Sequence, residues 1–138
     1  LELPEGDGYR LIQDREGEIS FFPARDPQAI SPANLNERAI RMLLSYFTGI
    51  VYEDKTTLPA DSLIFSAKSA KPLARLHVES HDGMKHTLQV FSYVENPGGE
   101  AHMFRALVVY NNEPYALIVN YIYLDVLMRD QTVYLGEN

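Results

Sequence analysis

The chain has 138 residues, no cysteine and no tryptophan, and its 12 basic and 19 acidic residues give a formal charge of −7 at pH 7. The missing cysteines exclude a disulfide framework, cysteine-ligated zinc, iron–sulfur clusters and thiol nucleophiles. A pI near 5.0 argues against a nucleic-acid partner, because nucleic-acid binders present basic patches to phosphate. The length and the 46% hydrophobic content predict one domain with its own core, residues 1–138.

The N-terminal segment predicts a lead-in followed by a hairpin. Residues 1–8 are acidic, contain Gly and Pro and do not resemble a signal peptide, so we expect a flexible lead-in cut from a longer chain. Tyr9–Gln13 and Glu18–Phe22 flank the turn residues Asp14–Gly17. This pattern predicts a first β-hairpin.

A long helix is predicted after the proline-containing loop Pro23–Pro32. Asn34 is placed to cap the amide three residues on, and Glu37 completes a capping-box-like pair. Gly49 is placed to end the helix. Apolar residues at i, i+3, i+4 and i+7 form one stripe: Ile40, Leu43, Leu44 and Phe47.

Regular structure is sparse in the segment that follows this helix. Ile50–Tyr52 is predicted as a short returning strand. Thr56–Pro72 is predicted to be irregular, with one helical turn near Asp61–Phe65.

The register of a second hairpin can be predicted from its side chains. A three-residue loop, His81–Gly83, sets Leu76 opposite Leu88 and Glu79 opposite Lys85. A two-residue loop would instead set apolar side chains opposite polar ones. We therefore predict the three-residue loop, in which the glycine takes the left-handed position of a type I turn with a bulge.

The last third of the chain predicts a turn, a hairpin and two terminal elements. Asn96–Gly99 suits a type II turn. The nearly continuous apolar stretches Phe104–Tyr110 and Tyr115–Val119 predict central strands that are covered on both faces. The terminal elements are a short helix capped by Asn120 and a last strand: Tyr121–Arg129 and Gln131–Leu135.

These elements contain no βαβ crossover, because hairpins follow one another directly. The predicted fold class is therefore α+β. We expect an antiparallel sheet built from successive hairpins, with one long and one short helix on one side.

Metal binding is the first chemistry to consider, since three of the 4 histidines fall in the second hairpin. In the favoured register His77 pairs with Thr87 on one face, and His86 pairs with Val78 on the other. His81 lies at the turn. Such rings diverge, whereas a metal requires converging ligands. We therefore predict no metal site.

Other catalytic and cofactor signatures do not occur in the sequence. Ser66–Lys71 combines Ser and Lys without the S-x-x-K spacing, and there is no G-x-S-x-G elbow. Phosphate-binding glycine motifs and calcium-loop spacing are missing as well. The sequence does not decide whether two carboxylates form a catalytic pair, because the members of such a pair need only be close in the folded chain. We predict no cofactor and lean against an enzyme.

Tyrosines provide the remaining candidate site. The chain has 9, and those of the last third lie beside asparagines. A tyrosine offers an apolar face and a hydroxyl, which suits interfaces and sugar stacking. The alternative is that these rings pack on the sheet, since strands favour aromatic residues. The candidate ligand-binding residues are Tyr110, Asn111, Asn112, Tyr115, Tyr121 and Tyr123.

Hydrophobic and turn motifs are spread over roughly residues 9–130: Leu43–Phe47, Tyr52-Glu53, Asp61-Ser62, the second hairpin and Tyr121–Leu124. Together they resemble a family of uncharacterised domains from envelope-associated, often lipoprotein-like chains of the Bacteroides group of bacteria. The resemblance implies an exported α+β domain, periplasmic or on the outer surface. It further implies a lipid tether outside this sequence, and it implies no functional residues.

Three functional hypotheses follow. The leading one is a non-catalytic, exported or envelope-associated domain that acts through contact with an unknown protein or small-molecule partner. The second is a glycan-binding or small-ligand-binding module centred on the Tyr/Asn-rich third hairpin. The third is a small hydrolase whose carboxylates or His102 meet only in the fold. Membrane association is expected only through the tether, because no run approaches the roughly 18 apolar residues of a spanning helix.

Overall fold

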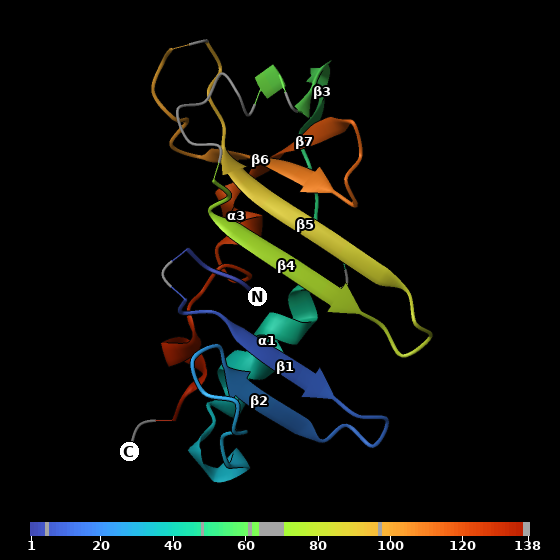
Figure 1. Ribbon diagram of the computed structural model, residues 1–138, viewed down its shortest axis with the longest axis vertical. Coiled ribbons are helices and arrows are strands. Elements are labelled where there is room, and N and C mark those ends of the chain that lie inside the picture. The colour runs from blue at the N-terminus through green and yellow to red at the C-terminus, as the bar shows by residue number, and fades with distance from the viewer. Residues whose placement is uncertain (5, 48, 61, 64–70, 97, 137–138) are drawn as a thin grey trace.

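The computed structural model describes residues 1–4, 6–47, 49–60, 62–63, 71–96 and 98–136. Its strands form a two-stranded sheet, β1-β2, and a five-stranded sheet in the order β3-β7-β6-β5-β4 (Figure 1). Every pairing between these strands is antiparallel. The predicted α+β class and antiparallel pairing are therefore confirmed, but the strands form two sheets rather than one.

The first hairpin forms as predicted. Strands β1 (Tyr9–Gln13) and β2 (Ile19–Pro23) pair along their whole length. The turn is closed by Asp14, whose Oδ1 accepts the amide hydrogens of Glu16 at 3.0 Å and Glu18 at 2.8 Å. An aspartate side chain that accepts from nearby backbone amides in this way stabilises a turn.

The two sheets are joined through the start of the lead-in. The Tyr9 amide donates to the Leu1 carbonyl at 3.1 Å on one side. On the other side Glu2 and Arg75 exchange two backbone hydrogen bonds of 2.8 and 2.9 Å. A Cβ on Gly8 would lie 2.1 Å from the Leu1 carbonyl oxygen, so this close approach requires glycine. The segment separates β1 from β4, which is why the first hairpin does not join the large sheet.

The second hairpin has the predicted register. Strands β4 (Ala74–Glu79) and β5 (Lys85–Ser92) set Leu76 opposite Leu88, and the first residue of β5 opposite the last of β4. The loop is closed by the Ser80 amide, which donates to the Met84 carbonyl at 2.9 Å. Gly83 has φ 84°, the left-handed conformation that the three-residue loop requires.

The centre of the large sheet is β6 (Arg105–Tyr110), which lies between β5 and β7 (Tyr115–Asn120). Its four middle residues are buried, so this strand is covered on both faces as predicted. Strand β3 (Asp54–Pro59) pairs with the free edge of β7. The prediction of a strand at Ile50–Tyr52 with irregular chain after it is wrong, because this open edge recruits a polar segment of weak strand character.

The long helix α1 (Glu37–Tyr46) starts later than predicted. Asn34 ends a 3-10 turn, η1 (Pro32–Asn34), and the cap is Asn36, whose side chain accepts from the Ala39 amide. The proline at the start of η1 favours this extra turn, which moves the helix start. Of the predicted stripe Ile40 and Leu43 are buried, Leu44 is half-buried, and Phe47 lies just past the helix end, 37% exposed.

The last two elements differ from those predicted: the helix is shorter, and the strand is replaced by a 3-10 helix. Asn120 caps α3 as predicted, accepting from the Ile122 amide at 3.1 Å, but the helix covers only Tyr121–Leu124. Residues Gln131–Tyr134 form a 3-10 helix, η2, instead of a strand. Asp130 caps η2 through the Thr132 amide at 2.8 Å, and this local bond competes successfully with strand pairing.

Three sequence predictions fall on residues outside the described ranges. These are part of the helical turn near Asp61–Phe65, most of the Ser66–Lys71 stretch, and Pro97 of the type II turn; of the first, Ser62 and Leu63 are described and are helical, as predicted. The described part of that turn agrees with the prediction, since Gly98 has φ 79° and the Gly99 amide donates to the Asn96 carbonyl at 2.9 Å.

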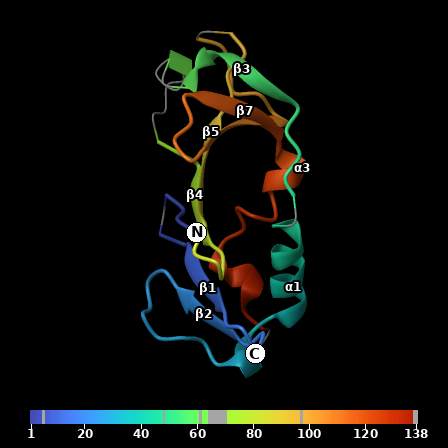
Figure 2. The ribbon, with the colours of Figure 1, turned by 90° about the vertical axis from the view of Figure 1, so that its right-hand side faces the viewer.

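The helices lie across from β4 and β5 on one side of these strands (Figure 2). One cluster of buried side chains packs between the large sheet and Leu124 of α3. A second fills the space between β1-β2, α1 and η2. Within it lies the aromatic cluster, which we define as Tyr9, Phe21 and Tyr134, with ring centroids 4.9 to 5.9 Å apart. A third, which includes Ala60 and Leu107, covers the opposite face of β6 and β7.

Candidate functional site

The predicted tyrosine and asparagine site is divided between two places. Tyr110, Asn111, Asn112 and Tyr115 lie where β6 turns into β7, whereas Tyr121 and Tyr123 begin α3 at the other end of β7. At about 3.4 Å per residue, the strand between these groups is on the order of 17 Å long. The tyrosines therefore do not line one common pocket.

At the turn end, the polar groups hold neighbouring strands together. Asn111 and Asn112 have φ 46° and 56°, as in a type I′ turn. The side-chain carbonyl of Asn111 accepts from the Thr87 amide at 2.8 Å. Tyr110 and His86 lie with the hydroxyl oxygen 2.7 Å from Nδ1 and with their rings stacked. These contacts give the three side chains structural roles.

The other three tyrosines differ in exposure. Tyr115 is 39% exposed, with Lys55 Nζ 5.8 Å from the centre of its ring. Tyr121 packs against the sheet cluster, and burial raises the pKa of its hydroxyl. Tyr123 is 38% exposed on α3. The tyrosines are therefore not all core residues, and those of α3 belong to a different surface from the turn.

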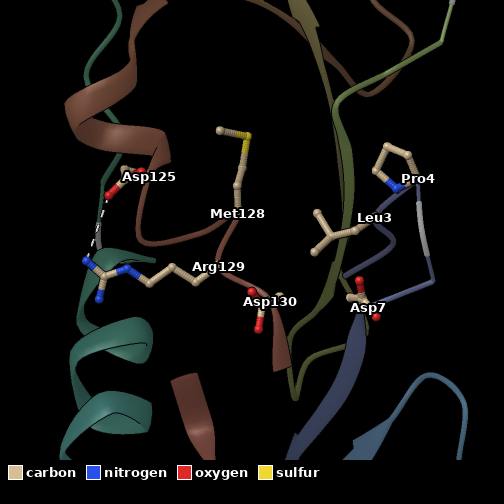
Figure 3. Close-up of a pocket in the computed structure, with 7 residues that line it drawn as sticks. All are labelled: Leu3, Pro4, Asp7, Asp125, Met128, Arg129 and Asp130. Carbon is tan, nitrogen blue, oxygen red and sulfur yellow. Dashed lines mark ion pairs between the residues drawn. The ribbon is translucent and has the colours of Figure 1, made fainter. Parts of the chain in front are cut away.

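An open cleft of about 510 Å³ lies between the lead-in and the chain that follows α3 (Figure 3). Its sides come from segments far apart in the sequence, with Leu3 on one side and Asp125 and Arg129 on the other. The lining residues are Leu3, Pro4, Asp7, Asp125, Met128, Arg129 and Asp130.

Each carboxylate of this cleft already has a partner. Asp7 lies 3.3 Å from the Arg25 guanidinium, and Asp125 lies 3.8 Å from that of Arg129. Asp130 accepts from the side-chain hydroxyl and the amide of Thr132, and these bonds hold its pKa below the ordinary value. The carboxylates of the cleft are thus held by ion pairs and hydrogen bonds within the chain.

Sequence reasoning missed an exposed apolar surface beside α3, which we call the contact surface. Large apolar side chains from three segments contribute to it, and Phe104 and Ile122 are 62% and 69% exposed. Isolated exposed residues of this kind are ordinary, but a group of them indicates an interaction site. The contact surface consists of Val51, Tyr52, Met103, Phe104, Ile122 and Tyr123, all of them exposed.

Hydrogen bonds and an ion pair place these segments next to one another. The Tyr121 amide donates to the Phe104 carbonyl at 2.9 Å, which joins α3 to the residues before β6. Glu53 Oε2 lies 2.5 Å from Arg105 Nε, and Glu53 Oε1 accepts from the Asn120 amide group at 3.4 Å. The segment that leads from α1 into β3 runs past α3 in Figure 2. These contacts therefore hold together the three segments that carry the exposed apolar side chains.

The sequence does hold a signal for part of this surface. Tyr121–Leu124 is a run of apolar residues that forms one helical turn. A single turn cannot direct all of its side chains to one side. Leu124 is buried and Tyr121 half-buried, so Ile122 and Tyr123 must face away from the sheet. No comparable signal marks Met103 or Phe104, because their exposure depends on where the preceding loop ends.

The histidines are arranged as the hairpin register predicts. His77 lies opposite Thr87, and His86 lies opposite Val78. Over the described ranges, no group of three or more histidine or carboxylate side chains is arranged to hold a metal ion. His102 accepts the Phe104 amide hydrogen through Nδ1 at 3.1 Å, which ties it to the contact surface.

Among the helices of the described residues, none is both long and apolar enough to cross a membrane. Comparison of the chain with protein-family models, with curated proteins and with solved structures finds no match.

Proposed function

We propose that this chain is a non-catalytic binding domain that acts through protein contact at the contact surface. The observation that carries this proposal is that six large apolar side chains are exposed on three segments, which contacts of Glu53 with Arg105 and Asn120 join together. Aromatic residues and Met are enriched at protein interfaces. Preformed backbone bonds lower the cost of ordering such a surface on binding.

Site-specific photo-cross-linking tests this function. A benzoyl-phenylalanine placed at Phe104 in the chain, produced in its source organism, is expected to yield a discrete protein adduct. The matched control is the same group at Ile12, which is 45% exposed on β1. The adduct should be lost when Ile122→Asp is added. Equal labelling from both positions, or an adduct that survives Ile122→Asp, would overturn the proposal.

The proposed location is the bacterial envelope, periplasmic or at the outer surface. Its support is the resemblance to envelope-associated, lipoprotein-like domains, which also implies that any membrane tether lies outside this sequence. Cell fractionation of the full-length gene product gives the test. Recovery with the envelope fraction would support the proposal. Protection from protease added outside the cells would then indicate the periplasm, and digestion would indicate the outer surface. Recovery in the cytoplasm would contradict the proposed location. The binding function would still be decided by the cross-linking experiment.

A further inference from the structure

We propose that the residues preceding Leu1 in the full-length gene product form a strand between β1 and β4, antiparallel to both. This strand would join the two-stranded and the five-stranded sheets into one antiparallel sheet. The inference goes beyond the proposed function and does not depend on it, because the contact surface is built from other segments of the chain.

Leu1 and Glu2 already pair with β1 and β4 as two residues of such a strand would. The Leu1 nitrogen donates to the Tyr9 carbonyl at 2.7 Å, and the Tyr9 amide donates back to the Leu1 carbonyl at 3.1 Å. Glu2 exchanges two bonds with Arg75 on the other side. Mutual bonds of this kind mark the hydrogen-bonded pairs of antiparallel strands. The backbone therefore runs back from Leu1 between β1 and β4, which point in the same direction from this place (Figure 1).

Beyond these two residues the facing edges of β1 and β4 are open. Backbone groups of every second residue point to the same side of a strand, so the edge positions that follow Tyr9 and Arg75 can be derived. They are Leu11 and Gln13 on β1, and His77 and Glu79 on β4. Among the described residues, none donates to or accepts from these backbone groups across the space between the two strands. One strand at the usual spacing of roughly 4.8 Å from each neighbour would satisfy both edges.

The inward-facing side chains lose cover at the same place. Leu1 packs against the two clusters beneath the sheets, and beside it Tyr9 and Leu76 are only 6% and 7% exposed. The next inward pair, Leu11 and Val78, is half-buried at the periphery of the same packing. In the proposed strand the second residue ahead of Leu1 bonds to Leu11 and lies beside Val78. We therefore expect apolar residues at the second and fourth positions ahead of Leu1, alternating with outward-facing ones.

A strand from a second copy or from another protein would have the same backbone chemistry, but the chain's own residues are favoured. Their covalent link to Leu1 holds them at the open edges at a high effective concentration. Strands that follow one another in the sequence also pair most often with each other, and the new strand would directly precede β1.

Disulfide trapping in the full-length gene product tests this strand and its register, since residues 1–138 contain no cysteine. One cysteine is introduced at the third position ahead of Leu1, and the second through Ile12→Cys. In the proposed register these positions are directly opposite and not hydrogen-bonded, with Cα atoms about 4.5 Å apart, which a disulfide can span. Mild oxidation should therefore link them within one chain, as peptide mass spectrometry will show.

Arg10→Cys, combined with the same cysteine ahead of Leu1, supplies the matched control. Arg10 and Ile12 are both exposed on β1, two residues apart. This shift sets the Cα of position 10 about 8 Å from the introduced cysteine, beyond the reach of a disulfide. The cross-link from position 10 should form at least about tenfold more slowly than that from position 12.

Hydrogen exchange without any cysteine gives a second measurement. The amides of His77 and Glu79 should exchange at least about tenfold more slowly in the full-length product than in the 138-residue chain, because the new strand accepts from them. The Val78 amide is the control, since Val78 faces its partner His86 on β5 and should be protected in both.

Several results would overturn the inference. These are equal cross-linking from positions 10 and 12, no cross-link from position 12, and unchanged exchange at His77 and Glu79. Disulfide-linked dimers would overturn it by assigning the space to a second copy. A gene product with fewer than four residues ahead of Leu1 would overturn it as well. None of these results changes the adduct expected from position 104, so the proposed function is decided separately.

Discussion

The aromatic cluster beneath β1 and β2 and the contact surface beside α3 are built from the same kinds of side chain, and burial separates them. Phe21 and Tyr134 are 0% and 1% exposed, whereas Phe104 and Ile122 are 62% and 69% exposed. The first group fills the space between the small sheet, α1 and η2. The second is fixed by hydrogen bonds and an ion pair without being covered. Burial in one region contributes to folding, and exposure in the other leaves apolar area available for binding.

Removing one phenylalanine from each region gives the largest expected contrast. Phe21→Ala should lower the free energy of unfolding by about 3–5 kcal/mol, because it leaves a cavity among packed rings. Phe104→Ala should change it by about 0.5 kcal/mol or less, as for other exposed positions. Urea denaturation followed by circular dichroism measures both. Comparable losses of unfolding free energy in the two variants would show that Phe104 contributes to folding as Phe21 does, which would contradict the assignment of Phe104 to a binding surface.

Sequence reasoning predicted the elements whose signals are local. The register of the second hairpin follows from matching Leu76 with Leu88 and Glu79 with Lys85, and the structure has these pairs. The sequence likewise predicts Asn120 as the cap of the last helix, and its side chain accepts from the Ile122 amide. β3 was missed because its pairing depends on the edge of β7, which lies about 60 residues away in the chain.

The candidate site was harder to predict because exposure is a property of the whole fold. The tyrosines of the last third cluster in the sequence, but β7 carries Tyr115 and Tyr121 to opposite ends. Tyr52 and Phe104 are separated in the sequence, and their segments meet in the fold through the ion pair of Glu53 with Arg105. A sequence pattern records which residues are apolar, and long-range packing decides which of them stay uncovered.

Loss of the side-chain cap of α1 is expected to have an intermediate effect on the free energy of unfolding. Asn36→Ala should lower the free energy of unfolding by about 1 kcal/mol, because the Ala39 amide loses its acceptor. Helix α1 carries Ile40 and Leu43 onto the aromatic cluster, so the effect belongs to that region. Chemical denaturation checks this value. Asn34→Ala is the control and should cost less, and a reversed order would show that the helix starts where the sequence alone predicted.

A smaller, pH-dependent effect is expected at Asp130, which caps the helix that carries Tyr134. The bonds from Thr132 lower the pKa of Asp130 in the folded chain, so the ionised form is favoured by folding. This stability is present above the unfolded pKa and is lost as pH falls through the folded pKa. The wild type should therefore exceed Asp130→Asn in stability at about pH 6, and the difference should shrink toward about pH 3. A difference that is independent of pH would contradict this assignment.

The smallest change is expected at Tyr9. Its hydroxyl is buried and, among the described residues, makes no hydrogen bond of ordinary geometry; burial first, and the neighbouring Tyr134 hydroxyl second, raise its pKa. Tyr9→Phe keeps the packing of the ring and removes the hydroxyl, which loses its hydration when the chain folds. Thermal unfolding should show an unchanged or slightly higher midpoint, with ΔΔG within about 1 kcal/mol. Tyr134→Phe is the contrast, since its hydroxyl donates to the Val126 carbonyl at 3.1 Å and its loss should destabilise the chain.

The central claim is that the contact surface serves binding and contributes little to folding. The most direct measurement is the yield of the adduct from position 104, taken together with the unfolding free energy, in the chain with Ile122→Asp. We predict that the adduct disappears while the free energy of unfolding changes by about 0.5 kcal/mol or less. An undiminished adduct, or a destabilisation of more than about 2 kcal/mol, would contradict the claim.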